Sequence, residues 1–145
     1  MIRNEPEYRE AAERINQERK RLALYEKNLR EQGLTAAEVK KAMQPLRSFH
    51  LQLVEEVAAY ERLKRGEFDQ LLNLHGLGQL LVSLRIARGL SQRELAKRLN
   101  VDEALVSRDE RNEYHNIGIE RASRILEAMG VRLKTVVEEF ASEAA

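Results

Sequence analysis

Apolar residues in the first part of the chain recur at the spacing of an amphipathic helix. Four of them lie seven residues apart, at Tyr8, Ile15, Leu22 and Leu29. Because seven residues make almost two helical turns, they form one stripe, and the pattern predicts a helix over about residues 7–32 that stops at Gly33. A coiled-coil seam has the same spacing, but the charged surroundings of Glu18 disfavour a long zipper.

A second amphipathic pattern follows and contains two start signals. Thr35 and Glu38 have the spacing of a capping box, in which each side chain bonds a free backbone N–H, so a short helix is expected there. Pro45 has no N–H and fits a first turn, which predicts a separate, longer helix over residues 46–65. Its apolar side would contain Phe49, Leu53, Val57, Tyr60 and Leu63. The long helices can bury their stripes against each other, as an antiparallel hairpin or its dimeric equivalent.

Short helical patterns occupy the second half of the chain. A seam between two domains is expected within residues 67–78, and the predicted domains are residues 1–66 and 67–145. An apolar row then predicts a helix from Leu77 that Gly89 ends. The glycines Gly76 and Gly78 mark its beginning, because they lack the preceding strand and the third glycine of a phosphate-binding loop.

Two closely spaced helices come next. Ser91 and Glu94 again have capping-box spacing and open a short helix. Asn100 is the non-glycine type that best adopts a positive φ, and Asp102 can cap a further helix over residues 103–112. Two such helices joined by a brief turn, with a small residue at their crossing, are what a helix-turn-helix requires. The small residue is Ala96, and two valines are expected to close the core beneath, Val101 and Val106.

The C-terminal segment gives one clear pattern and one ambiguous pattern. Residues 119–129 have apolar positions at helical spacing and end at Gly130. The tail over residues 131–140 alternates like a strand, yet part of its apolar spacing fits a helix. Either form could mediate dimerisation.

Composition and charge remove several classes of function. The chain has no cysteine, which excludes disulfides, thiolate metal sites and cysteine nucleophiles. His50, His75 and His115 stand alone, and no serine has an evident catalytic base, so no metal, cofactor or enzymatic activity is expected. No apolar run approaches the roughly 20 residues of a membrane span, and no signal peptide is evident, which predicts a cytoplasmic protein. The net charge is only +1, so nucleic-acid binding would need a local basic surface.

The stretch from Leu84 to Glu110 resembles the XRE family of phage-repressor (Cro-like) DNA-binding domains. Its most specific pieces are Arg88–Gln92, Glu94–Ala96 and Val106–Arg108. The resemblance covers roughly residues 77–137. It implies an all-α chain in which an N-terminal helical hairpin precedes a five-helix helix-turn-helix domain, with a short C-terminal strand as a further option.

The resemblance also implies roles for individual residues. Ser91 and Gln92 would hold a DNA phosphate at the start of the first helix of the motif. The helix over residues 103–112 would enter the major groove, where Arg108 is the first candidate to read guanine. Its other groove-facing residues would be Glu103, Ala104 and Ser107. Arg111 and Asn112 would contact the DNA backbone. Further candidates for that contact are Tyr114, His115 and Asn116. Arg85 and Glu110 would form a structural ion pair.

Three departures from the family pattern affect these expectations. Asn100 replaces the usual glycine of the turn, which is tolerable. Asp109 stands where an apolar residue is usual, so the reading helix is expected to be rotated or shortened. The segment from Arg111 to Gly118 lacks the usual glycine-containing loop.

Two functions fit these features. The first is a dimeric, sequence-specific repressor that binds double-stranded DNA. The second is an antitoxin-like protein whose N-terminal helices neutralise a toxin while the C-terminal domain regulates its own operon.

Overall fold

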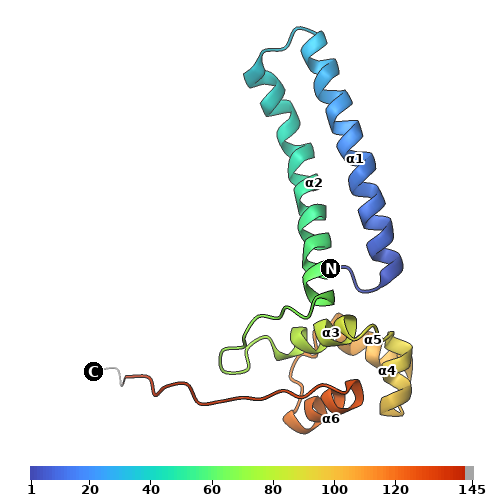
Figure 1. The fold of residues 1–145 in the computed structure, drawn as a ribbon, viewed down its shortest axis with the longest axis vertical. Coiled ribbons are helices and arrows are strands. Elements are labelled where there is room, and N and C mark those ends of the chain that lie inside the picture. Colours follow the sequence, from blue (N-terminus) through green and yellow to red (C-terminus); the bar gives the residue numbers. More distant parts are fainter. Residues whose placement is uncertain (143–145) are drawn as a thin grey trace. The chain divides into compact units, whose positions relative to one another are not determined.

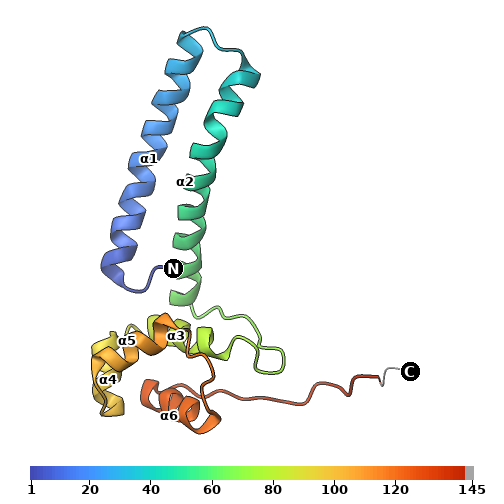
Figure 2. The same ribbon diagram turned by 180° about the vertical axis from the view of Figure 1, so that it is seen from behind.

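A computed structural model describes residues 1–142, which form six α-helices and no strand (Figure 1, Figure 2). The chain divides into two compact units, Met1–Gln70 and Leu71–Ala145. The all-α prediction is confirmed. None of the described helices is long and apolar enough to cross a membrane.

The first unit is a hairpin of two long helices, α1 (Glu5–Glu31) and α2 (Ala36–Lys64), which run antiparallel (Figure 1). Asn4 caps α1 by accepting a hydrogen bond from the Glu7 N–H at 2.9 Å. Near the turn of the hairpin the two helices bury an apolar cluster made by Leu29, Val39 and Met43. Towards its other end the rings of Tyr8 and Tyr60 stack, with centroids 4.9 Å apart.

The expected break at Pro45 is wrong, because α2 continues through the proline. A proline inside a helix removes one backbone hydrogen bond and usually bends the helix. Here Met43 and Val57, before and after the proline, are both buried, so packing in the hairpin offsets that loss. The Ser48 hydroxyl also donates to the Gln44 carbonyl at 2.9 Å, next to the proline.

The second unit contains four helices: α3 (Leu77–Ala87), α4 (Gln92–Leu99), α5 (Glu103–Arg111) and α6 (Ile119–Met129). Its core is built from side chains of all four, among them Leu81, Leu95, Val106, Ile125 and Met129. The capping box that opens α4 is complete: the Ser91 hydroxyl accepts from the Glu94 N–H at 3.0 Å, and the Glu94 carboxylate accepts from the Ser91 N–H at 2.9 Å.

Some local expectations for this unit differ from the structure. Residues 131–142 form neither the fifth helix nor the strand, and Val136, Val137 and Phe140 are largely exposed. A single strand needs a neighbour for its backbone groups, and the described residues supply none. Val101 is 37% exposed, so of the two valines only Val106 closes the core. Asp102 is the N-cap of α5, but its side chain makes no capping bond.

Candidate DNA-binding surface

The turn between α4 and α5 fixes how α5 is presented. Asn100 adopts φ 55° and ψ 47°, the left-handed conformation that ends α4, and asparagine tolerates it better than most residues. The next N–H, of Val101, donates to the Ala96 carbonyl at 3.0 Å. Because the Ala96 side chain is small and buried, α5 can cross close to α4. The turn therefore has the geometry that the sequence predicted for a helix-turn-helix.

The two sides of α5 differ in burial. Val106 and Glu110 are buried and hold the helix to the rest of the unit. The opposite side exposes Glu103, Ala104 and Arg108 to solvent, while Ser107 is half-buried. The Arg108 guanidinium makes no hydrogen bond or ion pair to any residue within 1–142. The candidate reading residues thus lie on an outward-facing helix surface.

A buried polar network lies behind this surface. Arg85 is 3% exposed and forms a two-pronged ion pair with Glu110, one bond from Nε and the other from Nη2 to Oε2 at 2.9 Å. The remaining guanidinium nitrogen donates to the Leu90 carbonyl at 2.7 Å. Planar two-pronged pairing is the strongest arrangement of these groups, and it ties α3 to α5. The network fixes the base from which α5 projects.

Gln92 belongs to the same network. Its side-chain amide donates to Glu110 Oε2 at 2.7 Å, which joins the start of α4 to the end of α5. The Ser91 hydroxyl is occupied by the capping box. In this structure both side chains therefore serve helix geometry, and a phosphate at this point would be held mainly by the backbone N–H groups that begin α4.

Asp109 has a partner that the sequence did not reveal. Its carboxylate accepts a hydrogen bond from Arg121 on α6. The helix α5 runs from Glu103 to Arg111, with Asn112 as its C-cap, close to the predicted range 103–112. Because both carboxylates at the end of α5 are paired with arginines, the negative charge next to the candidate surface is reduced.

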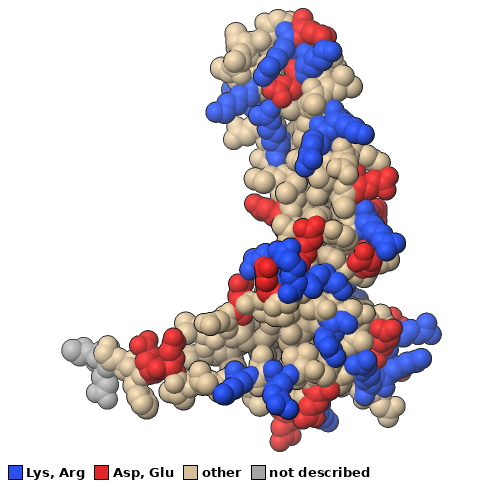
Figure 3. Space-filling view, in the orientation of Figure 1, with Lys and Arg blue, Asp and Glu red and all other residues tan. Residues whose placement is uncertain are grey.

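Positive charge remains available around α4 and α5. Four cationic side chains there are exposed and make no ion pair with any residue that the structure describes: Arg93, Lys97, Arg108 and Arg111. Lys and Arg side chains gather over the end of this unit that carries α4 (Figure 3). Cations in such positions attract phosphate groups without any requirement for sequence.

Two other arginines have structural roles that spacing alone did not indicate. The Arg88 Nε donates to the Met129 carbonyl at 3.0 Å, and Arg98 donates to the Ala128 carbonyl at 2.9 Å. Both carbonyls belong to the last turn of α6, where cations are favoured by the helix dipole. These bonds link α3 and α4 to the end of α6.

The loop after α5 corrects one expectation. Tyr114 was a candidate for the DNA backbone, but its side chain is buried, and burial raises the pKa of its hydroxyl above the ordinary value. Glu113, Tyr114 and Asn116 all have positive φ values, which non-glycine residues rarely adopt. The loop packs against the start of α3 in this unusual conformation. Asn112, His115 and Asn116 remain exposed.

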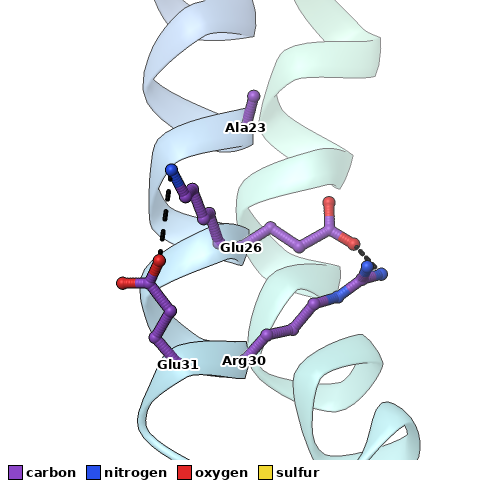
Figure 4. Close-up of a pocket in the computed structure, with 5 residues that line it drawn as sticks. Ala23, Glu26, Arg30 and Glu31 are labelled. Carbon is purple, nitrogen blue, oxygen red and sulfur yellow. Dashed lines mark hydrogen bonds and ion pairs between the residues drawn. The ribbon is translucent and has the colours of Figure 1, made fainter.

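A shallow depression on α1 is a weaker candidate site. Its charged lining residues are already paired, Arg30 with Glu26 and Lys27 with Glu31, through contacts one helical turn apart (Figure 4). Glu26 also pairs with Arg47 of α2 at 2.9 Å. Each charged group that lines the depression thus has a partner of opposite charge on α1. Among residues 1–142 no group of three or more His, Asp or Glu side chains is placed to hold a metal ion.

Comparison with known proteins agrees with the geometry of the second unit. Residues 81–136 match the family model described as helix-turn-helix. This range contains all of α4, α5 and α6 and most of α3. Searches of curated proteins and of solved structures found no significant match. Residues 81–136 therefore resemble the XRE family of helix-turn-helix domains, and an N-terminal helical extension precedes them.

Proposed function

We propose that the protein is a dimeric, sequence-specific repressor, in which residues 67–145 read DNA and residues 1–66 are an interaction or dimerisation module. The observation that carries this proposal is the outward face of α5, where Arg108 has no partner within residues 1–142 and stands on a base fixed by the Arg85–Glu110 pair. A rigid helix that exposes polar side chains fits the major groove.

Each exposed residue has a role that its chemistry allows. The Arg108 guanidinium donates twice to O6 and N7 of guanine, a contact worth about 1–3 kcal/mol against the wrong base. Glu103 accepts from the amino group of cytosine, and Ala104 contacts a thymine methyl group. Ser107 lies beside them and hydrogen-bonds a neighbouring base edge.

The surrounding residues position the protein on the DNA backbone. Arg111 and Asn112, at the end of α5, contact phosphates, and the start of α4 holds another phosphate near Ser91 and Gln92. A single reading helix covers few base pairs, so two copies read half-sites about 34 Å apart. Binding represses transcription by occupying a promoter.

Selection of bound sequences from random double-stranded DNA tests the proposal. The wild-type protein should enrich a motif with two related half-sites. Arg108→Ala should lose preference at one base pair of each half-site, whereas Arg111→Ala should keep the motif, weaken binding to all sequences alike and reduce the salt dependence by about one phosphate contact. Failure of the wild type to enrich any motif would refute the function. An unchanged motif with Arg108→Ala would refute the role of that residue.

A second candidate is an antitoxin-like role, in which residues 1–66 neutralise a toxin while the DNA-binding domain regulates the operon. Exposed apolar side chains on the hairpin, such as Leu24 and Leu51, favour some protein partner. Co-expression of the full chain with the product of an adjacent gene tests this candidate. Relief of growth arrest, together with a stoichiometric complex of the two purified proteins, would establish it.

A further inference from the structure

The end of the hairpin that contains its turn is strongly basic. Residues 19–47 carry eight Lys or Arg and three Glu, a net charge of +5, whereas residues 1–18 and 48–66 carry six Lys or Arg and eight Glu. We name residues 19–47 the basic tip. The contact of His50 Nδ1 with Glu18 Oε2, at 3.3 Å, marks where the tip begins on both helices. Lys and Arg side chains predominate over the tip in the view of Figure 3.

The carboxylates of the basic tip are already occupied. Glu26 accepts from Arg30 at 2.8 Å and from Arg47 at 2.9 Å. The other two carboxylates are held by Lys27 and by the hydroxyl of the helix cap Thr35. Five exposed cations of the tip make no ion pair with any residue that the structure describes: Arg19, Lys20, Arg21, Lys40 and Lys41. Their charge is not balanced within the hairpin.

Two rows of side chains on the basic tip form one face. Residues three or four apart lie one above the other on a helix. Such steps give one row on each helix: Arg19, Ala23, Glu26 and Arg30 on α1, and Lys40, Gln44 and Arg47 on α2. The bond from Arg47 to Glu26 crosses between the helices and places the two rows side by side. We name the four cations of these rows the basic face.

The basic face keeps most of its hydrogen-bond donors free. Arg30 and Arg47 each donate to Glu26 through one nitrogen, and their side chains are still 67% and 52% exposed. A guanidinium has five N–H donors, so most of them remain on both residues. Arg19 and Lys40 are exposed and have no ion pair in the described chain. The face therefore sets four cations around one carboxylate.

The chemistry of the basic face fits phosphate groups. The remaining members of the two rows are Ala23 and Gln44, so the rows contain no large apolar side chain. The core of a protein–protein interface is depleted of charged residues, whereas DNA phosphates are contacted mainly by Arg and Lys. From Arg19 to Arg30 the row is about 16 Å long, which matches about five base pairs of duplex DNA.

We infer that the basic face binds the phosphate backbone of duplex DNA, as a second, sequence-independent contact of the chain that carries α5. This inference rests on the proposed function, in which the second unit brings the chain to DNA. A second binding surface on the same chain has a high local concentration at the DNA, so it raises the affinity without adding sequence preference.

Binding of the full chain to two duplexes of equal length, one with the selected motif and one of unrelated sequence, tests the inference. Fluorescence anisotropy at several salt concentrations measures both affinities. Arg19→Gln combined with Lys40→Gln should weaken binding to both duplexes alike, several-fold at fixed salt. It should also reduce the slope of log Kd against log salt concentration by about two, because two phosphate contacts are lost. Polyglutamate is a third probe, which stands for an acidic protein partner.

The matched control is Arg21→Gln combined with Lys41→Gln, which removes the same charge from the basic tip. Arg21 lies on the opposite side of α1 from Arg19, because two residues turn a helix by about 200°. Lys41 is turned by about 100° from Lys40. The control should leave the salt slope unchanged and alter Kd less than about twofold, since salt screens charges that do not contact the DNA. Circular dichroism should show equal helix content in all variants.

Equal affinity of the wild type and of the variant with Arg19→Gln and Lys40→Gln for both duplexes would overturn the inference. An equal loss in the control would overturn it too, because overall charge would then be responsible. A loss of polyglutamate binding with no loss on either duplex would assign the face to an acidic protein instead. A wild type that prefers no motif, but loses affinity through the basic-face substitutions, would refute the proposed function and leave this inference standing.

Discussion

At the scale of single residues, the position of α5 depends on one buried charge pair. Arg85 uses all three guanidinium nitrogens within the unit, on Glu110 and on the Leu90 carbonyl, and Gln92 adds a further bond to the same carboxylate. A buried ion pair that is fully hydrogen-bonded costs little, but removal of one member leaves the other charged and unpaired. The network therefore sets the relative positions of α3, α4 and α5.

We predict that Arg85→Ala destabilises the helix-turn-helix unit by about 3–5 kcal/mol, because Glu110 is left buried without its counter-ion. Urea unfolding followed by circular dichroism measures this change. Arg124→Ala is the matched control, since Arg124 is exposed on α6 and should change the stability by less than about 0.5 kcal/mol. Equal unfolding midpoints for the two variants would contradict the prediction.

The structural role of a single residue could be predicted from the sequence only where a local rule or the family resemblance applies. The resemblance suggested that Arg85 and Glu110 meet, and the positive φ of Asn100 follows from its residue type. The bonds that Arg88 and Arg98 make to the end of α6 depend on how distant helices pack. No spacing along the chain encodes such a contact.

At the scale of elements, the starts of helices could be predicted. The continuation of α2 through Pro45 and the irregular conformation of residues 131–142 could not. Capping residues fix the starts of α2 and α4 through bonds within one turn, so the sequence shows them directly. Continuation of α2 through Pro45 depends on packing against α1, which local propensity does not contain. The tail after Gly130 has apolar residues but no surface among the described residues on which to bury them.

The contact between the start of α3 and the loop after α5 leads to a prediction at this scale. A Cβ atom on Gly78 would lie 1.9 Å from the Glu113 carbonyl oxygen and 3.2 Å from the Tyr114 Cβ. Gly78→Ala must therefore separate backbone from backbone, and we expect it to destabilise the unit by about 1–3 kcal/mol. Thermal unfolding followed by circular dichroism would show this as a lower melting temperature.

Gly118→Ala is the matched control for that substitution. A Cβ atom at Gly118 meets nothing within 4 Å, and its φ of −74° suits any residue. The expected change is small, about 0.5 kcal/mol, from the altered N-cap and the less flexible unfolded chain. A Gly78→Ala variant as stable as Gly118→Ala would show that the loop moves away at no cost.

At the scale of the whole molecule, pairing and reading are assigned to different units. The hairpin proposed as the dimerisation module lies in Met1–Gln70, while α5, which is proposed to read DNA, lies in Leu71–Ala145. Because each unit has its own core, a substitution on the surface of one should leave the fold of the other intact. The two proposed activities can therefore be separated by single substitutions.

Phe49 is 74% exposed on the hairpin that is proposed to join two copies, so Phe49→Glu should weaken binding to a complete site but leave the preferred half-site unchanged. Joining two reading units makes the second contact intramolecular, which commonly increases affinity about 10²–10⁴-fold. We expect Phe49→Glu to lose an advantage of that size on DNA with two half-sites, and to bind a single half-site as the wild type does. Fluorescence anisotropy at fixed salt, with both DNAs, measures these affinities. An equal loss on both DNAs would mean that the hairpin itself contacts DNA at Phe49. No loss on either DNA would mean that Phe49 does not join two copies of the protein.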